Sequence, residues 1–185
     1  MKIKVTIKNP PMKNEEKHLY NLDELSDYKV ASDDPDVRGW QVRDEDNRVI
    51  GKVDNLIVNK TARRVVYLDV EVDKTIIDAR YDPYSRPENA DIREFVNKDG
   101  ENHVIIPIGM VSLDVENKTV RSQGINHRTF AETKRFSADN PINREYEVTV
   151  LDSYNRERVP PTTVYEDDDF YERDEFDRER YSRRK

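Results

Sequence analysis

The sequence predicts a mainly β fold: a small β-barrel with short helical turns, a long inserted loop and a charged C-terminal tail. Residues 36–72 carry most of this prediction, because they divide into three apolar runs of strand length separated by short polar turns. Composition sets the size of the barrel. Hydrophobic residues make up 35% of the 185 positions and charged residues 38%, which is enough apolar material for one small core.

The clearest strand is expected at residues 64–73, where apolar and polar side chains alternate with the strand period of two. The run before it, residues 48–58, is rich in β-branched residues, and Gly51 in its middle predicts a bulge or a corner. Turns are expected at 44–47 and 59–62, since Asn and Asp tolerate left-handed backbone. We expect the barrel interior to hold Val66, Leu68, Val70, Val72, Ile106 and Ile108, and the opposite strand face to meet water at Tyr67, Asp69, Glu71 and Asp73.

The remaining elements are shorter. Asp99-Gly100 is a dipeptide typical of hairpins, so strands are expected on either side of it, at residues 93–97 and 103–108. A further strand is expected at 119–123. Helical turns are expected around Leu19, Leu22 and Leu25, and at residues 128–134, which Asn126 and His127 cap or lead into.

Four segments in this order resemble a known family: G-W-Q-V-R-D at 39–44, N-R-V-I-G-K-V-D-N-L-I-V-N at 47–59, R-V-V-Y-L-D-V-E-V at 64–72 and H-V-I-I-P-I-G-M-V-S-L-D at 103–114. They are similar to the PRC-barrel, the β-barrel of the H subunit of the purple-bacterial photosynthetic reaction centre. The resemblance extends through residues 125–135 and an expected extended segment at 146–151, and covers residues 28–154. We expect structural roles for Gly39, Trp40, Gly51, Leu68, Pro107, Gly109 and His127.

The resemblance implies a non-enzymatic binding or adaptor protein of the H-subunit-like type, acting through protein–protein contacts. Two alternatives stay open: a ribosome-maturation-like factor that docks on a ribosomal protein, and an accessory subunit of photosynthetic electron transfer. The H subunit carries a membrane-spanning helix before its barrel, whereas here no window approaches the roughly 20 apolar residues that cross a bilayer. A second difference is the inserted loop, expected at residues 74–92. The N-terminal residues also lack the continuous apolar region of a signal peptide. We therefore expect a soluble, cytoplasmic protein with no transmembrane segment.

Motifs for catalysis, cofactors or metals are missing from the sequence. The chain has no Cys, no G-x-S-x-G, no glycine-rich phosphate loop and no H-E-x-x-H. The acidic turn 44–47 lacks the glycine and distal glutamate of a calcium loop, and reads as a solvated hairpin turn. His18, His103 and His127 do not have metal-ligand spacing. We expect no catalytic, cofactor or metal site, and the net charge of −7 makes direct binding of nucleic acid unfavourable.

Charge divides the chain into three expected segments: a basic N-terminal arm at 1–18, the barrel domain with its C-terminal extension at 19–154, and a charged tail at 155–185. We expect the tail to be disordered, with a marginal or partner-docked helix as the alternative. An unidentified protein, or a second copy of this chain, is the expected partner. The residues that we expect at such an interface are Tyr81, Asp82, Tyr84 and Arg86 in the inserted loop and Phe170, Tyr171 and Phe176 in the tail.

Overall fold

The computed structural model describes residues 17–73, 102–133, 135–136, 141–155, 167–177 and 179. Several expected features lie outside these residues: most of the basic arm, the inserted loop, the strand at 93–97 and the Asp99-Gly100 hairpin. What is described confirms a mainly β architecture with short helices.

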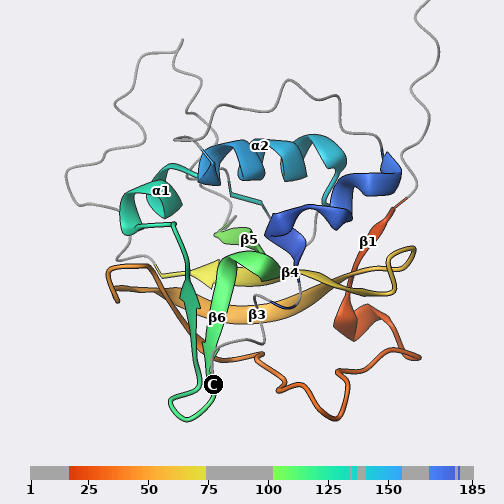
Figure 1. The fold of residues 1–185 in the computed structure, drawn as a ribbon, viewed down its shortest axis with the longest axis horizontal. Coiled ribbons are helices and arrows are strands. Elements are labelled where there is room, and N and C mark those ends of the chain that lie inside the picture. Colours follow the sequence, from red (N-terminus) through yellow and green to blue (C-terminus); the bar gives the residue numbers. More distant parts are fainter. Residues whose placement is uncertain are drawn as a thin grey trace, which may run out of the picture.

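Seven strands form one curled sheet with the order β5-β4-β3-β2-β7-β6, and β1 pairs with β3 beside this path (Figure 1). All described pairings are antiparallel except that of β2 with β7. Within the described chain no pairing joins β5 to β6, so the sheet is a half-barrel with an open side. The strands are β1 (Leu19–Asn21), β2 (Gln41–Arg43), β3 (Val49–Asn59), β4 (Arg64–Val72), β5 (His103–Pro107), β6 (Val111–Asp114) and β7 (Thr119–Ser122).

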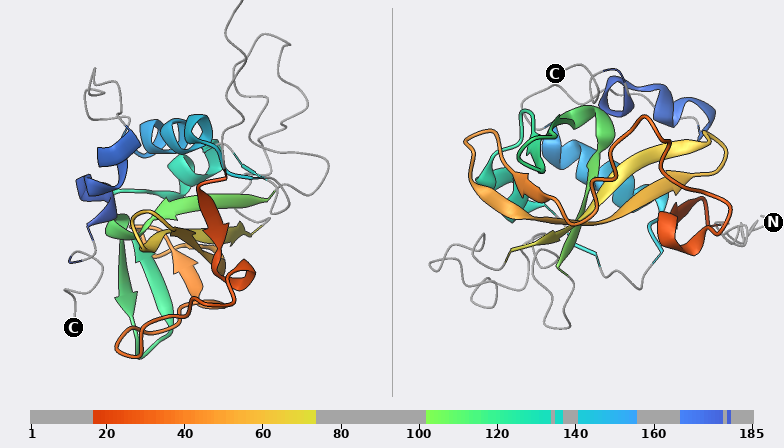
Figure 2. Two further views of the ribbon diagram at one scale, coloured as in Figure 1. Left: turned by 90° about the vertical axis from the view of Figure 1, so that its right-hand side faces the viewer. Right: turned by 90° about the horizontal axis from the view of Figure 1, so that it is seen from below.

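Short helices complete the fold. They are η1 (Leu22–Glu24), η3 (Ile108–Met110), α1 (His127–Glu132), α2 (Arg144–Tyr154), η4 (Asp167–Glu172) and η5 (Asp174–Phe176). Helices α1 and α2 and the η4–η5 segment gather on one side of the sheet, while the loop before β2 passes along the other side (Figure 2). No helix in the described part of the chain is both long and apolar enough to cross a membrane.

The β3–β4 hairpin is the longest pairing of the sheet and is bent by two register shifts. One shift falls between Val53 and Asn55 and leaves Asp54 unpaired, as in a β-bulge. A third shift, in the β2–β3 pair, lies beside Gly51. A Cβ on Gly51 would lie 2.0 Å from the carbonyl oxygen of Glu71, so only glycine allows the two strands to approach here. The prediction of a bulge or corner at this glycine is confirmed.

The interior of the half-barrel holds the predicted apolar face. Val66, Leu68, Val70, Val72, Ile106 and Ile108 are all buried. The opposite face of β4 is not half-wet as expected: Tyr67 and Asp69 are buried, and only Glu71 and Asp73 are exposed. The expectation was wrong for Tyr67 and Asp69 because α2 and the tail cover this face of the sheet (Figure 1).

Residues 146–151 are helical, and the expectation of an extended segment was wrong. Asn143 caps α2, its side chain accepting from the Tyr146 backbone N–H at 2.9 Å, and Glu145 and Glu147 occupy the first turn. Both features stabilise a helix start. The buried apolar residues recur at helical spacing, and this pattern outweighs the β-branched Val148, Thr149 and Val150. They are Tyr146, Val150, Leu151 and Tyr154.

The two other predicted helical turns are formed in part. Asn126 caps α1 as expected, because its Oδ1 accepts from the Thr129 backbone N–H at 2.9 Å. Near the N-terminus only Leu22 lies in a helical turn. Leu19 belongs to β1, where it pairs with Asn59 of β3.

Residues 167–177 of the tail, a region that we expected to be disordered, lie on the sheet as the short helices η4 and η5. Phe170, Tyr171 and Phe176 are buried in the core cluster. The Phe176 ring meets Tyr67 edge-on, with centroids 5.2 Å apart and an interplanar angle of 88°. The tail is highly charged, but the burial of its three aromatic side chains removes enough apolar area from water to stabilise this segment against the sheet.

Candidate functional site

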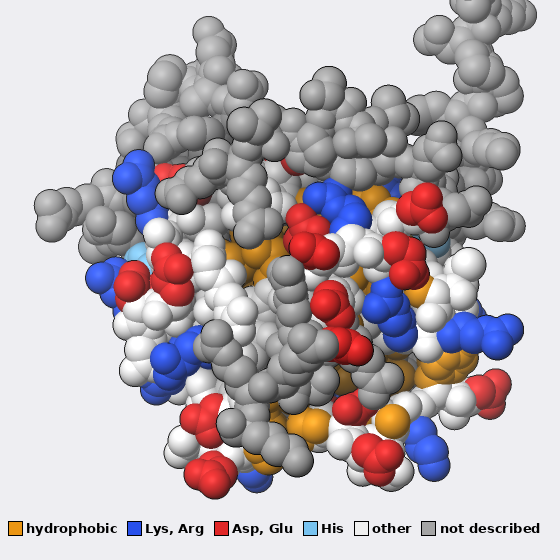
Figure 3. All heavy atoms as spheres, in the orientation of Figure 1, with side chains coloured by type: hydrophobic (Ala, Val, Ile, Leu, Met, Phe, Trp, Pro, Cys, Tyr) orange, Lys and Arg blue, Asp and Glu red, His pale blue; other side chains and the backbone are white. Residues whose placement is uncertain are grey.

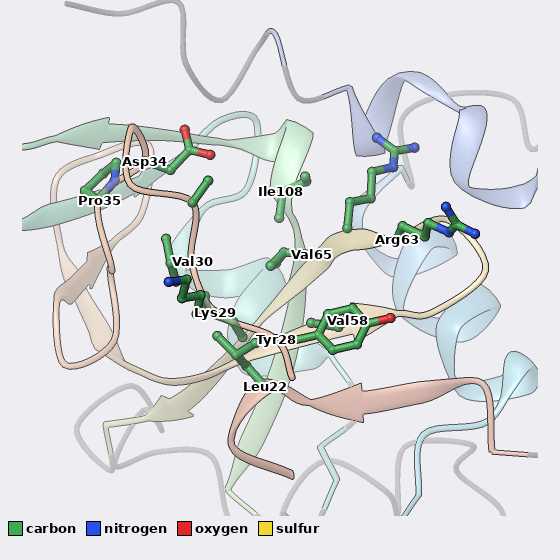
Figure 4. A pocket seen from close by; sticks show the side chains of 13 residues that line it. Leu22, Tyr28, Lys29, Val30, Asp34, Pro35, Val58, Arg63, Val65 and Ile108 are labelled. Atoms are coloured by element: carbon green, nitrogen blue, oxygen red, sulfur yellow. The ribbon is translucent and has the colours of Figure 1, made fainter. Parts of the chain in front are cut away.

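A groove opens at the mouth of the half-barrel, between the loop that precedes β2 and the concave sheet. We call it the barrel-mouth groove, and its cavity measures about 190 Å³. Val58, Val65 and Ile108 contribute its apolar floor, while Tyr28 and Val30 come from the loop (Figure 4). The other lining residues are Leu22, Lys29, Ala31, Asp34, Pro35, Leu56, Arg63 and Arg64.

The loop side of the groove is built from successive turns that local hydrogen bonds and ion pairs stabilise. The Tyr28 backbone N–H donates to the Leu25 carbonyl at 3.1 Å. Arg38 anchors the far end: its Nε donates to Asp36 Oδ1 at 2.9 Å, and its Nη1 contacts Asp23. The hydrogen bond from Arg38 lowers the pKa of the Asp36 carboxyl, and the same bond raises the pKa of Arg38. This ion cluster joins the loop before β2 to η1.

Two cations at the groove have no ion-pair partner among the described residues. Lys29 and Arg63 are both exposed, and Arg63 holds a left-handed backbone (φ 53°) in the β3–β4 turn. Arg64 is different, because the tail uses it. Its Nη1 donates to the Phe176 carbonyl at 2.9 Å and its Nη2 contacts the Tyr171 carbonyl. Positive charge is therefore available to a ligand at Lys29 and Arg63.

On the face of the sheet that the tail covers, the buried carboxylate of Glu147 in α2 binds several neighbouring side chains. Its Oε1 accepts from the hydroxyls of Tyr67 at 2.9 Å and Tyr171 at 2.7 Å, and its Oε2 lies 2.8 Å from His18 Nε2 and 3.2 Å from Arg144 Nη1. Burial, and then the neighbouring Glu147, raise the pKa of both tyrosines. These bonds join β4, α2, the tail and the segment before β1.

A second group of polar residues lies on the same side of the sheet, on the neighbouring strands β3, β4 and β5. His103 Nδ1 lies 2.7 Å from Asp69 Oδ1. A carboxylate oxygen of Asp54 lies nearby, and one nitrogen or oxygen atom from each of the three residues lies within 4.8 Å of the other two. Burial raises the pKa of Asp69, and the hydrogen bond with Asp69 raises the pKa of His103. Sequence spacing missed this group because each residue comes from a different strand.

A larger polar groove, about 840 Å³, runs between α1, the end of α2 and η5. Its charged and polar side chains mostly bind one another. Arg128 Nε donates to Glu132 Oε1 at 2.9 Å, and Asn155 Nδ2 donates to Glu175 Oε1 at 2.9 Å. This arrangement stabilises the tail junction, and the groove is a weaker candidate site.

The residues expected at an interface fall into two groups. Tyr81, Asp82, Tyr84 and Arg86 lie outside the described residues. Phe170, Tyr171 and Phe176 lie in the core, where they contact the chain's own sheet. None of the tail aromatics is therefore presented on the surface of the described structure.

For each residue that we expected to be structural, the backbone conformation, the burial or a close contact explains why that residue type occurs there. Gly39 has a left-handed backbone (φ 81°) and leads into the buried Trp40, and Leu68 is fully buried. Pro107 ends β5 opposite Tyr67. A Cβ on Gly109 would lie 2.6 Å from the Glu175 carbonyl oxygen, so glycine allows the tail to approach η3.

The last of them, His127, starts α1 and acts through its backbone. Its N–H donates to Asp44 Oδ2 at 2.8 Å, and Asp44 Oδ1 accepts from the Arg48 backbone N–H at 2.7 Å. Asp44 is fully buried, so the acidic turn is not simply solvated as expected. It fixes α1 against the barrel.

Comparison with protein families agrees with this architecture. The model of the PRC-barrel domain matches residues 30–125, just over half of the chain, from the loop of the barrel-mouth groove to a point just after β7. No curated protein matches the sequence. The surface seen in Figure 3 mixes acidic and basic side chains, with apolar ones between them. By its fold and its family match, the chain belongs to the PRC-barrel domain family.

Proposed function

We propose that this protein is a non-enzymatic adaptor that binds a partner protein in the barrel-mouth groove. PRC-barrel domains are protein-interaction modules and are generally non-catalytic. One observation carries the choice of surface. Among the described residues two large hydrophobic side chains are exposed, Tyr28 and Val115, and Tyr28 lines the groove. An exposed tyrosine at the edge of an apolar depression is typical of an interface anchor.

The lining of the groove defines the chemistry of the partner segment. Val58, Val65 and Ile108 offer an apolar floor, and Lys29 and Arg63 offer positive charge without an internal ion pair. A segment with one or two apolar side chains beside a carboxylate would bury its apolar part and pair its charge. Complementary charge of this kind favours the correct partner and speeds association.

The other side of the sheet is less accessible to a partner. Helix α2 and the η4–η5 segment cover it, and the hydroxyls of Tyr67 and Tyr171 are bound to Glu147 there. A partner would have to displace the chain's own tail to reach that face. The groove requires no such displacement in the described structure.

An H-subunit-like role, including that of an accessory subunit in photosynthetic electron transfer, is the finer form of this proposal. Docking on a ribosomal protein is the alternative, and the net charge of −7 favours it because ribosomal partners are basic. The cations Lys29 and Arg63 at the groove oppose it. We therefore favour an acidic–apolar partner segment over a basic one.

A photo-crosslinking amino acid placed at Tyr28 tests the proposal. The matched control carries the same amino acid at Val115, the other exposed hydrophobic position, which follows β6. We expect one defined adduct from the native cell extract at position 28, and none at position 115. The adduct should be suppressed by Arg63→Glu and retained with Lys118→Glu, a charge reversal at another exposed left-handed turn residue.

The outcomes separate the alternatives. Identical adducts at positions 28 and 115, or an adduct that survives Arg63→Glu, would contradict docking in the groove. An adduct with a basic ribosomal protein, together with salt-sensitive co-sedimentation with ribosomes, would favour the ribosome-maturation-like alternative.

A further inference from the structure

We infer that Asp54, Asp69 and His103 form a binding site for a divalent transition-metal ion of the Zn²⁺ class. This site is separate from the barrel-mouth groove and does not depend on the proposed function. Its three residues come from β3, β4 and β5, which are neighbours in the sheet. One nitrogen and two carboxylate oxygens, all within 4.8 Å of one another, provide a suitable ligand set.

The backbone explains how three strands bring these side chains together. His103 pairs with Glu71 in the β4–β5 register, which places its ring diagonally next to Asp69. Asp54 is the unpaired residue of the β3 bulge opposite Val70 and Asp69. Bulges redirect side chains, and this one brings Asp54 to the pair on β4 and β5.

The charge balance of the cluster favours a cation. Asp54 and Glu71 lie close enough to act electrostatically on both Asp69 and His103. Three carboxylates thus surround one imidazole, and Asp69 is almost fully buried. Lys52 lies opposite Glu71 in the strand register. In the described structure neither it nor any other lysine or arginine forms an ion pair with these carboxylates. A divalent ion would neutralise the excess negative charge.

The required movement is small. Ligand atoms in a tetrahedral zinc site lie about 3.4 Å apart, given bonds of about 2.1 Å. His103 Nδ1 and Asp69 Oδ1, now 2.7 Å apart, would separate by about 0.7 Å as the metal replaces their shared proton. The exposed Asp54 can approach by side-chain rotation. His103 is already oriented by the Phe136 ring, whose centroid lies 5.7 Å away.

The ligand types select the ion. Imidazole with carboxylate suits zinc and its neighbours, whereas Ca²⁺ and Mg²⁺ prefer oxygen ligands alone. Three protein ligands would leave a fourth position for water or for a group from another molecule. The site would therefore be open rather than closed, as in zinc sites that exchange a ligand.

Zinc titration of the chelator-treated full chain by calorimetry tests the inference. We expect one equivalent of Zn²⁺ to bind with saturation in the presence of excess Mg²⁺ and Ca²⁺. His103→Gln should abolish binding. Asp54→Asn should weaken it by at least about 10-fold, because even outer-shell partners change metal affinity by that factor. Because Asp54 is exposed, this variant is expected to fold, which circular dichroism would verify.

Two controls match these variants. Asp46→Asn removes an exposed carboxylate from the acidic turn, and His127→Gln removes an imidazole from α1. Both should bind zinc like the unmodified chain. The Co²⁺ complex should show a ligand-field spectrum that is lost in His103→Gln. Absence of saturable zinc binding, equal affinity in Asp54→Asn, or a loss of affinity in His127→Gln instead of His103→Gln would each overturn the inference.

Discussion

The Tyr67 ring of β4 and the Phe176 ring of η5 meet edge-on, with centroids 5.2 Å apart, although 109 positions separate them in the sequence. The contact joins the middle of the barrel to the end of the chain. The hydroxyls of Tyr67 and Tyr171 also donate to the same oxygen of Glu147. The tail is thus part of the core, and this has measurable consequences.

Removal of the tail should destabilise the barrel. A chain ending at Asn155 loses Phe170, Tyr171 and Phe176, and Phe176→Ala alone should cost about 3–5 kcal/mol, as for other buried large-to-small changes. Urea unfolding measures both. The control chain ends at Glu179 and keeps all three aromatics, so its free energy of unfolding should change by less than about 0.5 kcal/mol. Equal stability of the two truncated chains would show that the tail does not dock.

Gly109→Ala should destabilise only a chain that has its tail. The new methyl group would lie 2.6 Å from the Glu175 carbonyl oxygen, a backbone atom that cannot rotate away. We expect a cost of about 1–3 kcal/mol in the full chain. In the chain ending at Asn155 the cost should fall below about 0.5 kcal/mol, since the partner atom is gone. An equal loss of stability in the full chain and in the chain ending at Asn155 would show that the strain does not come from contact with the tail.

Leu68→Ala tests the assignment of the barrel interior. Leu68 is fully buried in β4, so its truncation should cost about 2–5 kcal/mol. Val115→Ala is the control at an exposed position and should change stability by less than about 0.5 kcal/mol. A Leu68→Ala effect as small as that of the control would mean that the wrong face of β4 has been placed inside.

Alkaline pH should unfold the protein cooperatively. Burial raises the pKa of Tyr67, Tyr146, Tyr154 and Tyr171 above the usual value for tyrosine. The folded state therefore favours the neutral phenol, and its stabilisation is complete below about pH 10 and declines as the pH rises further. Phenolate absorbance should show these four residues ionising together with the loss of circular dichroism. Ionisation of all ten tyrosines in one unperturbed step, with the fold intact, would contradict their burial.

The sequence was sufficient for elements whose pattern is local. The alternation at 64–73 predicted β4 and its inner face, and the Asn126 cap predicted α1. It was insufficient where distant segments decide the environment. Tyr67 and Asp69 look solvated in their strand, but α2 and the tail, far along the chain, bury them. The resemblance to the H subunit led to the expectation of an extended segment at 146–151, whereas the Asn143 cap and the spacing of the buried residues favour a helix.

The candidate sites also depend on contacts between distant segments, which local sequence patterns do not reveal. The interface residues predicted from aromatic and charged composition included Phe170, Tyr171 and Phe176, which pack internally instead. Tyr28 has no sequence motif that distinguishes it, because the barrel-mouth groove that it lines is assembled from the loop before β2 and from residues of β3, β4 and η3. The group of Asp54, Asp69 and His103 was also invisible, since a strand bulge and two strand pairings assemble it.

Binding of a short fluorescent peptide, followed by anisotropy, tests the central claim that the barrel-mouth groove binds an acidic–apolar segment. The peptide carries leucine and phenylalanine flanked by glutamates, and its counterpart carries the same residues flanked by lysines. We expect saturable binding of the acidic peptide only, weakened at least about 10-fold by Arg63→Glu, a loss of about 1.4 kcal/mol, and unchanged by Lys118→Glu. Tighter binding of the lysine-flanked peptide would contradict the claim. Equal binding of the acidic peptide by the Arg63→Glu and Lys118→Glu variants would also contradict it.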